Sequence, residues 1–302
     1  MRIVSLLPSC TEIVCALGCA EQLVGRSHEC DFPPEIQSLP VCTSARLNPA
    51  ASSAEIDREI KSLLQRALSI YEVDAARIEQ LRPDVILTQD QCEVCAVNTA
   101  DLQKALPNHP KIVSVSAKRM ADIWADIQTI ADALGVGVEG RSLLSGLKNR
   151  VVDIIQKTCM IKKRPSVACI EWLDPLMVAG NWAPEMVDLG GGRDLLGAPG
   201  KHSAWMEWDQ LAGANADIII LMPCGFDLER TRRESVSLAN HPGWLRLHAV
   251  KTNNVFITDG NHYFNRPGPR VVESVETLAE IFHPKLFAFG HENKTWARLG
   301  RR

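Results

Sequence analysis

Short runs of aliphatic and β-branched residues recur along the chain, and each run ends at a polar or proline-containing loop. Such runs are typical of strands that are buried on both faces, as in parallel sheets. They lie at residues 2–7, 85–87, 111–115, 167–170, 217–221 and 254–258. Longer amphipathic segments separate them, so the hydrophobic pattern predicts alternating strands and helices of the α/β class.

The segments between the runs carry the period of amphipathic helices. After Ser53, for example, Ile56 and Ile60 recur at helical spacing with charged residues between them. Ser9 is expected to be the N-cap of the first helix, because its hydroxyl can accept a hydrogen bond from the first helical turn. Helices are expected at 11–17, 75–81, 120–134, 138–160, 227–238 and 270–282.

The helix expected at 138–160 is long for one that lies inside a single domain, about 30 Å or more at its usual rise per residue. It separates two alternations of strand and helix. The predicted fold is therefore two Rossmann-like α/β lobes joined by a long backbone helix. The predicted boundaries are an N-terminal lobe at 1–117, a connecting helical segment at 118–162 and a C-terminal lobe at 163–302.

The net charge and the length of the apolar runs indicate which partners the protein is not expected to have. The chain has 302 residues, of which 46% are hydrophobic and 23% charged, and its net charge is −3. A weakly acidic protein has no electrostatic reason to bind nucleic acid. No apolar run approaches the roughly 18 residues that cross a bilayer. We therefore expect neither a nucleic-acid partner nor insertion into a membrane.

Two observations predict the location of the protein. The apolar run at 3–7 stops at Pro8 and is too short for the core of a signal peptide. The chain has ten cysteines, and without an export signal these are expected to be reduced thiols. The sequence therefore predicts a cytoplasmic protein.

Loops that follow the predicted strands carry the polar and aromatic side chains that suit a binding site. Ligands of open α/β sheets bind beyond the carboxyl ends of the strands. We expect both lobes to contribute to one cleft, and the loop aromatics suit a large planar ligand. Packing within the loops is the alternative for each aromatic, and helix capping is the alternative for the serine and threonine. The candidate ligand-binding residues are Ser9, Thr11, Glu29, Asp90, Gln91, Glu93, Glu171, Trp172, Trp182, Tyr263, Phe264, Asn265 and Arg266.

Cysteine and histidine in two of these loops predict a metal site. Cys92 and Cys95 form a Cys-x-x-Cys pair, and His28 and Cys30 lie in the loop after an earlier strand. Three sulfurs and one imidazole nitrogen make a tetrahedral ligand set. Two alternatives stay open: only some of the four residues approach one another, or the Cys-x-x-Cys pair is a redox couple.

Six motifs in this order resemble one known family. They are R-I-V-S-L-L-P-S-C-T-E-I at 2–13, V-G-R-S-H-E-C-D-F-P at 24–33, L-R-P-D-V-I-L-T at 81–88, G-G-G at 190–192, A-D-I-I-I-L at 216–221 and V-F-I-T-D at 255–259. The chain is similar to the cobalamin-binding proteins among the class III substrate-binding proteins. These are the helical-backbone receptors of ABC importers for corrinoids, haem and siderophores. The resemblance covers nearly the whole chain and is nearest to relatives without a leader.

This resemblance implies a non-catalytic protein whose two lobes clasp a corrinoid, such as cobalamin, or a related metal chelate. His28 or a thiol would then contact the cobalt. An ABC permease is implied as a partner only if the protein is exported. Of the carboxylates that dock such proteins to their permease, Asp209 is the one match, and Ala75 and Ala76 occupy the first-lobe place. The alternative is an intracellular metalloprotein or enzyme that holds zinc or an iron–sulfur cluster, and no catalytic residue is assigned.

Overall fold

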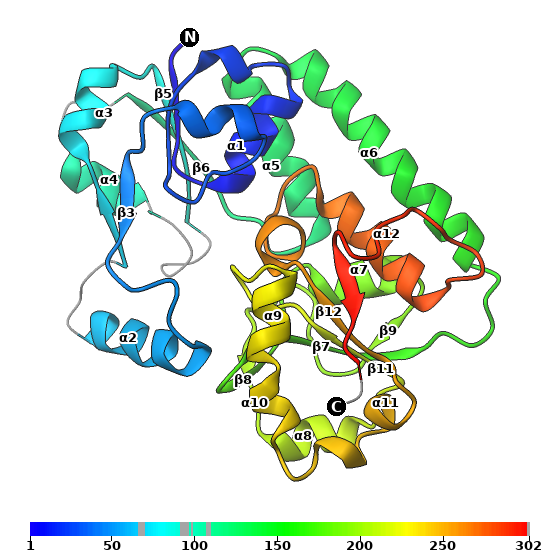
Figure 1. Ribbon diagram of the computed structural model, residues 1–302. Helices are drawn as coiled ribbons and strands as arrows, with labels where there is room; N and C mark the ends of the chain where they lie inside the picture. Colours follow the sequence, from blue (N-terminus) through cyan, green and yellow to red (C-terminus); the bar gives the residue numbers. More distant parts are fainter. Residues whose placement is uncertain (66–69, 91–96, 98, 107–109, 301–302) are drawn as a thin grey trace. The chain divides into compact units, whose positions relative to one another are not determined.

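The computed structural model divides the chain into two compact units, each of which is described by itself (Figure 1). The structure describes residues 1–65, 70–90, 97, 99–106 and 110–300. The first unit comprises residues 1–51, 55–117 and 121–146. The second comprises residues 52–54, 118–120 and 147–302.

A four-stranded parallel sheet in the order β2-β1-β5-β6 forms the centre of the first unit. The strands are β1 (Ile3–Ser5), β2 (Leu23–Arg26), β5 (Val85–Gln89) and β6 (Lys111–Val115). Ile3 pairs with both Leu23 and Val85, so β1 is hydrogen-bonded on both edges. The first apolar run of the sequence is therefore an interior strand, as its continuous hydrophobicity predicts.

Helices and a small antiparallel sheet complete the first unit. The helices are α1 (Pro8–Ala16), α2 (Ser53–Gln65), α3 (Ala75–Leu81), α4 (Thr99–Ala105) and α5 (Met120–Ala133), with the 3₁₀ turns η1 (Ala20–Gln22) and η2 (Pro34–Ser38). The small sheet pairs β3 (Thr43–Ala45) with β4 (Tyr71–Val73). Val4, Ile86, Ile78 and Leu102 are buried together, which packs the main sheet against its helices.

Three parallel strands form the centre of the second sheet: β7 (Ser166–Leu173), β11 (Ile218–Leu221) and β12 (Val255–Thr258). Antiparallel strands lie at both edges of this sheet, whose strand order is β10-β8-β7-β11-β12-β13. These are β8 (Leu176–Val178), β10 (Ala204–Trp205) and β13 (Trp296–Arg298), while the short β9 (Arg193–Asp194) pairs with the start of β7. The two edge strands, β10 and β13, have only two and three residues, so they leave few unpaired backbone groups for other chains to bind.

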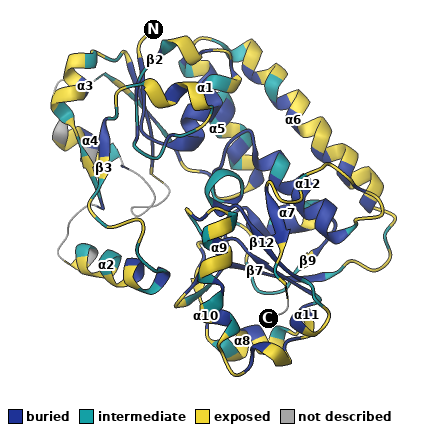
Figure 2. Cartoon of the chain, viewed as in Figure 1, coloured by how far each residue is buried: buried dark blue, intermediate teal, exposed yellow. Residues whose placement is uncertain are grey.

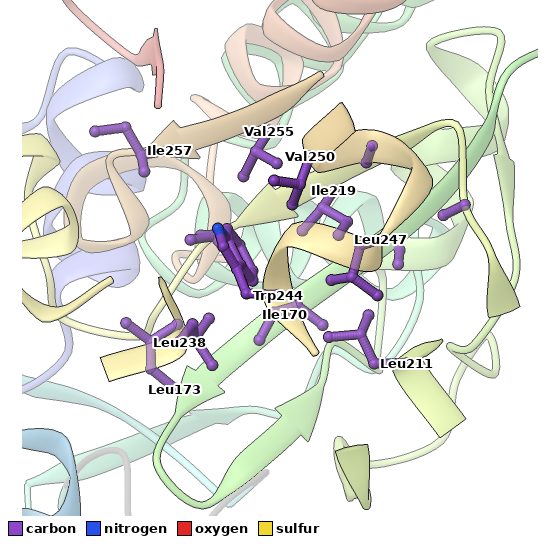
Figure 3. Close-up of a cluster of buried hydrophobic side chains, with 14 of the residues drawn as sticks. Ile170, Leu173, Leu211, Ile219, Leu238, Trp244, Leu247, Val250, Val255 and Ile257 are labelled. Atoms are coloured by element: carbon purple, nitrogen blue, oxygen red, sulfur yellow. The ribbon is translucent and has the colours of Figure 1, made fainter. Parts of the chain in front are cut away.

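The second unit is rich in short helices. They are α7 (Ala183–Leu189), α8 (Trp208–Ala214), α9 (Leu228–Glu234), α10 (Val236–Ala239), α11 (His248–Lys251), α12 (Val271–Phe282), the 3₁₀ turn η3 (Trp244–Arg246) and the π-helical turn η4 (Gly260–Phe264). Figure 3 shows the core on one side of the sheet, where Trp244 packs among Ile170, Ile219 and Leu238. The single helix predicted at 227–238 is two helices, α9 and α10, which meet at Ser235.

The long helix predicted in the middle of the chain is α6 (Gly137–Thr158), which has 22 residues. Its residues 137–146 belong to the first unit and residues 147–158 to the second. Much of its surface is exposed, in contrast to α12, where nearly every residue is buried (Figure 2). The connecting role predicted for 118–162 stays a prediction.

No helix of the described residues is long and apolar enough to span a bilayer.

Two glycines of α6 are expected to respond to alanine in opposite directions. A Cβ on Gly146 would meet nothing within 4 Å, whereas one on Gly140 would lie 2.5 Å from the Cβ of Ala131 in α5. Gly146→Ala should raise the free energy of unfolding by about 0.5–1 kcal/mol, because glycine loses more backbone entropy in a helix. Gly140→Ala should lower it, and urea denaturation measures both. A destabilised Gly146→Ala protein would contradict this account.

Candidate functional site

The first helix begins earlier than predicted. Pro8 is the first residue of α1 and Leu7 is its N-cap, so the prediction that Ser9 caps the helix is wrong. Proline is well suited to the first turn, because it needs no backbone hydrogen-bond donor there. Ser9 and Thr11 are both buried within the unit. Their predicted contacts with a ligand stay predictions.

Thr11, in α1, contacts two strand-end segments of the first unit by hydrogen bonds. Its hydroxyl oxygen lies 2.8 Å from the Ser5 hydroxyl at the end of β1 and 3.1 Å from the Cys30 sulfur in the loop after β2. Cys30 is buried, and its sulfur lies 3.8 Å from the Ser5 carbonyl oxygen. These contacts fix the start of α1 against the loop that follows β2.

His28 and Glu29 lie in the same loop and are held by the small sheet. The His28 Nδ1 atom lies 2.8 Å from the Thr43 hydroxyl, and the Tyr71 hydroxyl donates to Glu29 at 3.1 Å. Burial lowers the pKa of His28, and the positive charge of Arg26 lowers it further. His28 is therefore a neutral imidazole at pH 7, which is the form that binds a metal.

Asp90 follows β5 and accepts three hydrogen bonds from its own unit. The donors are the Thr99 backbone at 2.9 Å, the Thr99 hydroxyl at 2.8 Å and the Ser114 hydroxyl at 2.6 Å. Burial alone would raise the pKa of Asp90, but these hydrogen bonds outweigh it and lower the pKa. Asp90 therefore links α4 and β6 to the end of β5 by hydrogen bonds.

Four predicted site residues, Gln91, Cys92, Glu93 and Cys95, lie outside the described residues. Of the predicted metal ligands, only His28 and Cys30 are therefore described. Among the residues that the structure places, no group of three or more histidine, cysteine or acidic side chains is arranged to hold a metal ion. The four-residue metal site stays a prediction.

Three of the four aromatic side chains predicted to line the second-lobe site belong to the interior of the second unit. Trp182 and Phe264 are 6% and 1% exposed, and the Trp182 indole donates to the Phe264 carbonyl at 2.9 Å. Trp172 is buried against Phe226, with 5.3 Å between the ring centres. Next to it, Glu171 accepts a hydrogen bond of 2.7 Å from Ser203. Trp172, Trp182 and Phe264 therefore pack within the protein, which is the alternative that the sequence left open for each aromatic.

The turn η4, which follows β12, is fixed from both sides. The Asp259 carboxylate accepts from the His262 backbone and from the His262 ring, each at 2.8 Å. The Asn265 amide donates to the carbonyls of Met222, just after β11, at 3.1 Å and of Gly260 at 2.9 Å. A Cβ on Gly260 would lie only 2.2 Å from the Pro223 carbonyl oxygen, so this close approach requires glycine. Single π-helical turns are rare and often occur at functional sites.

His262 and Tyr263, both half-buried, stand side by side on η4. The Arg270 guanidinium lies 4.9 Å from the centre of the Tyr263 ring. Burial raises the pKa of Tyr263 and outweighs Arg270, which lowers it, so Tyr263 is a neutral phenol at pH 7. Arg266 is buried and donates to the Asn261 side chain at 3.3 Å. His262 lies in a strand-end loop but is not among the candidate ligand-binding residues predicted from the sequence, although an aspartate three residues before a histidine is a detectable spacing.

These strand-end loops belong to a fold with known relatives. A model of the periplasmic binding protein family matches residues 3–261. The chain belongs to the periplasmic binding protein family. A relative from Bacillus subtilis strain 168, named an uncharacterized ABC transporter substrate-binding lipoprotein, YvrC, is 23% identical over 295 residues, which is 95% of this chain and 81% of the relative.

Solved structures share the fold of this periplasmic binding protein at low sequence identity. A periplasmic haem-binding protein from Pseudomonas aeruginosa has a TM-score of 0.76 at 18% identity and covers 100% of this chain and 98% of its own. The periplasmic vitamin B12-binding protein BtuF of Vibrio cholerae has a TM-score of 0.67 at 18% identity, covering 93% and 96%. The predicted α/β fold of the class III substrate-binding proteins is confirmed, and so is the resemblance itself.

Membership of this family tests two predictions made from the sequence, the type of function and the location of the protein. A substrate-binding protein of the ABC-transporter type is confirmed, whereas an intracellular metalloprotein or enzyme has no support. The prediction of a cytoplasmic protein is wrong, because the relatives of this periplasmic binding protein are periplasmic proteins or lipoproteins. The prediction rested partly on the number of cysteines. Cys10, Cys42 and Cys169 are buried free thiols. Such thiols pack as small apolar side chains and do not indicate a compartment.

Proposed function

We propose that this periplasmic binding protein captures a metal tetrapyrrole, a corrinoid or haem, and delivers it to an ABC permease. The observation that carries the proposal is the turn η4. It holds an imidazole and a phenol side by side at the carboxyl end of β12, where ligands of α/β sheets bind. A tetrapyrrole offers a broad apolar face for the Tyr263 ring and a metal that an imidazole can approach.

The backbone around His262 supports this role. Histidines that approach a metal usually donate their other ring nitrogen to a carboxylate, which fixes the orientation of the ring. Asp259 is buried and accepts from the Nδ1 atom of His262 at 2.8 Å. The remaining nitrogen, Nε2, is then the one that carries the lone pair. It lies 3.4 Å from the Asn261 amide nitrogen.

The relatives support the same ligand class and partner. Two structures of the same fold are named as haem-binding and vitamin B12-binding proteins, and both ligands are large metal tetrapyrroles. The relative from Bacillus subtilis is named as part of an ABC transporter, which supports delivery to a permease. On this chain, Asp209 is exposed in the first turn of α8 and is the carboxylate that we propose for docking.

Absorbance titration of the purified protein with hydroxocobalamin and with haemin tests the ligand. We expect one of them to bind with a Kd in the micromolar range or tighter, and Tyr263→Ala to weaken that binding by about tenfold, the equivalent of one lost ring contact of about 1–1.5 kcal/mol. Leu245→Ala, an exposed residue of η3, is the control. Binding of neither compound, together with binding of a ferric tris-catecholate, would overturn the proposal.

A further inference from the structure

Three large hydrophobic side chains are exposed near the end of α6 and in the segment after α12 of the second unit. Met160 follows the end of α6. Val152 and Ile155 are exposed on the opposite side of the helix from Lys157 and do not belong to this group. Leu286 and Phe289 lie in the segment after α12. Met160 is 84% exposed and Leu286 51%, which is unusual for such side chains. We call Met160, Leu286 and Phe289 the α6 patch.

Side-chain contacts join the segment after α12 to the second half of α6. Lys157 on α6 lies 5.5 Å from the centre of the Phe287 ring, and Phe287 and Phe289 stack with 5.5 Å between their ring centres. About two turns earlier on α6, Arg150 binds Glu276 at 2.8 Å, and His291 contacts the same carboxylate at 3.1 Å. The segment from 286 to 291 therefore runs along the second half of α6 (Figure 1).

The sequence around the α6 patch is strongly basic. Residues 148–164 contain six basic side chains and one acid, a net charge of +5, whereas the whole chain has a net charge of −3. Arg150 and Arg164 are paired with Glu276 and Asp188. The other four are exposed lysines, and a fifth belongs to the segment after α12: Lys148, Lys157, Lys162, Lys163 and Lys285.

We infer that the α6 patch is a docking surface for a membrane that contains anionic lipids. Aliphatic and aromatic side chains surrounded by lysines are typical of segments that lie in the lipid headgroup region. Long lysine side chains place their ammonium groups among lipid phosphates while their stems stay apolar. Protein interfaces, in contrast, are depleted in lysine relative to the rest of the surface. Charge complementarity thus favours a lipid surface over a protein partner.

Co-sedimentation with vesicles tests the inference. The protein should pellet with vesicles of phosphatidylcholine mixed with phosphatidylglycerol, pellet much less with phosphatidylcholine alone, and be released by high salt. Removing two lysines, in Lys162→Gln/Lys163→Gln, should weaken binding to the mixed vesicles by about tenfold or more. Met160→Glu/Leu286→Glu should weaken it at least as much, and both side chains are exposed enough for the protein to stay folded.

Matched variants separate this surface from general charge effects. Arg232→Gln/Arg233→Gln removes two exposed positive charges from α9, and Leu245→Glu changes an exposed leucine of η3 in the same way. Both should pellet as the unchanged protein does. Failure of the unchanged protein to pellet with anionic vesicles, or equal pelleting of all four variants, would overturn the inference. A dimer in solution that Met160→Glu/Leu286→Glu converts to a monomer would also overturn it, because a second copy would then cover the patch.

Discussion

Trp182→Ala is expected to lower the free energy of unfolding by about 3–5 kcal/mol, the usual cost of removing a large buried aromatic side chain. Trp182 is buried between α7 and the turn η4, and its indole nitrogen donates to the Phe264 carbonyl at 2.9 Å. The substitution would leave a cavity and an unpaired buried carbonyl. Chemical denaturation followed by circular dichroism measures the loss.

Trp182→Phe is the matched control. It keeps most of the apolar volume and removes the hydrogen bond, so it should cost about 1–2 kcal/mol. Because Trp182 anchors η4, Trp182→Ala should also weaken binding of the proposed tetrapyrrole ligand. If Trp182→Ala lost ligand binding and kept the stability of the unchanged protein, the indole would be a ligand contact and its interior role would be refuted.

Arg150→Met should have the second largest effect, a loss of about 2–3 kcal/mol, as for strong hydrogen bonds to a charged group. The Arg150 guanidinium donates to both carboxylate oxygens of Glu276, at 2.9 and 2.8 Å. Glu276 lies on the buried helix α12, and its side chain is only 9% exposed. Without the arginine, the burial of this carboxylate would be compensated mainly by His291, at 3.1 Å.

The same pair predicts a pH dependence. Burial would raise the pKa of Glu276, but hydrogen bonds from His291 and Arg150 outweigh it and lower the pKa below the ordinary value of 4.5. A carboxylate with a lowered pKa stabilises the fold above its unfolded value, and this stability disappears as the pH falls through the folded pKa. In Arg150→Met the folded pKa of Glu276 should rise toward or above its unfolded value, so the loss of stability on acidification that Glu276 contributes should become smaller.

Urea denaturation from neutral to acidic pH distinguishes this account from simple loss of packing. Glu276→Gln in the Arg150→Met background should restore part of the stability at neutral pH, since no buried charge then remains. Residue 276 should then contribute nothing to the pH dependence of stability, because glutamine does not titrate. An Arg150→Met protein with unchanged stability and an unchanged pH profile would show that the ion pair contributes nothing.

The sequence was sufficient for the interior parallel strands because their apolar runs have one physical interpretation, whereas the short strands β4, β8, β9, β10 and β13 were not predicted. Residues 85–87 and 218–221 are continuous and aliphatic, and both are interior parallel strands. Helix ends were less certain, since Pro8 and Ser9 can each begin a helix and only the packing of α1 decides between them. Likewise, the break at Ser235 between α9 and α10 interrupts a pattern that is amphipathic throughout.

The site was harder to predict for a different reason. A tryptophan or phenylalanine in a loop has the same sequence signal whether it faces a ligand or the interior. Phe264 faces the interior because η4 folds back over the ends of β11 and β12, through the contact of Gly260 with Pro223. The dyad of Asp259 and His262 depends on the same π-helical turn, which residue propensities do not indicate.

The division of α6 between the two units has a consequence for folding cooperativity. Ten of its 22 residues complete the first unit and twelve complete the second. An isolated helix shorter than about 12–15 residues is marginal in water. If either unit unfolded alone, the half-helix left on its neighbour would lose its continuation and much of its own stability. The two units should therefore unfold in a single transition, and a chain cut near Gly146 should yield two fragments that cannot fold separately.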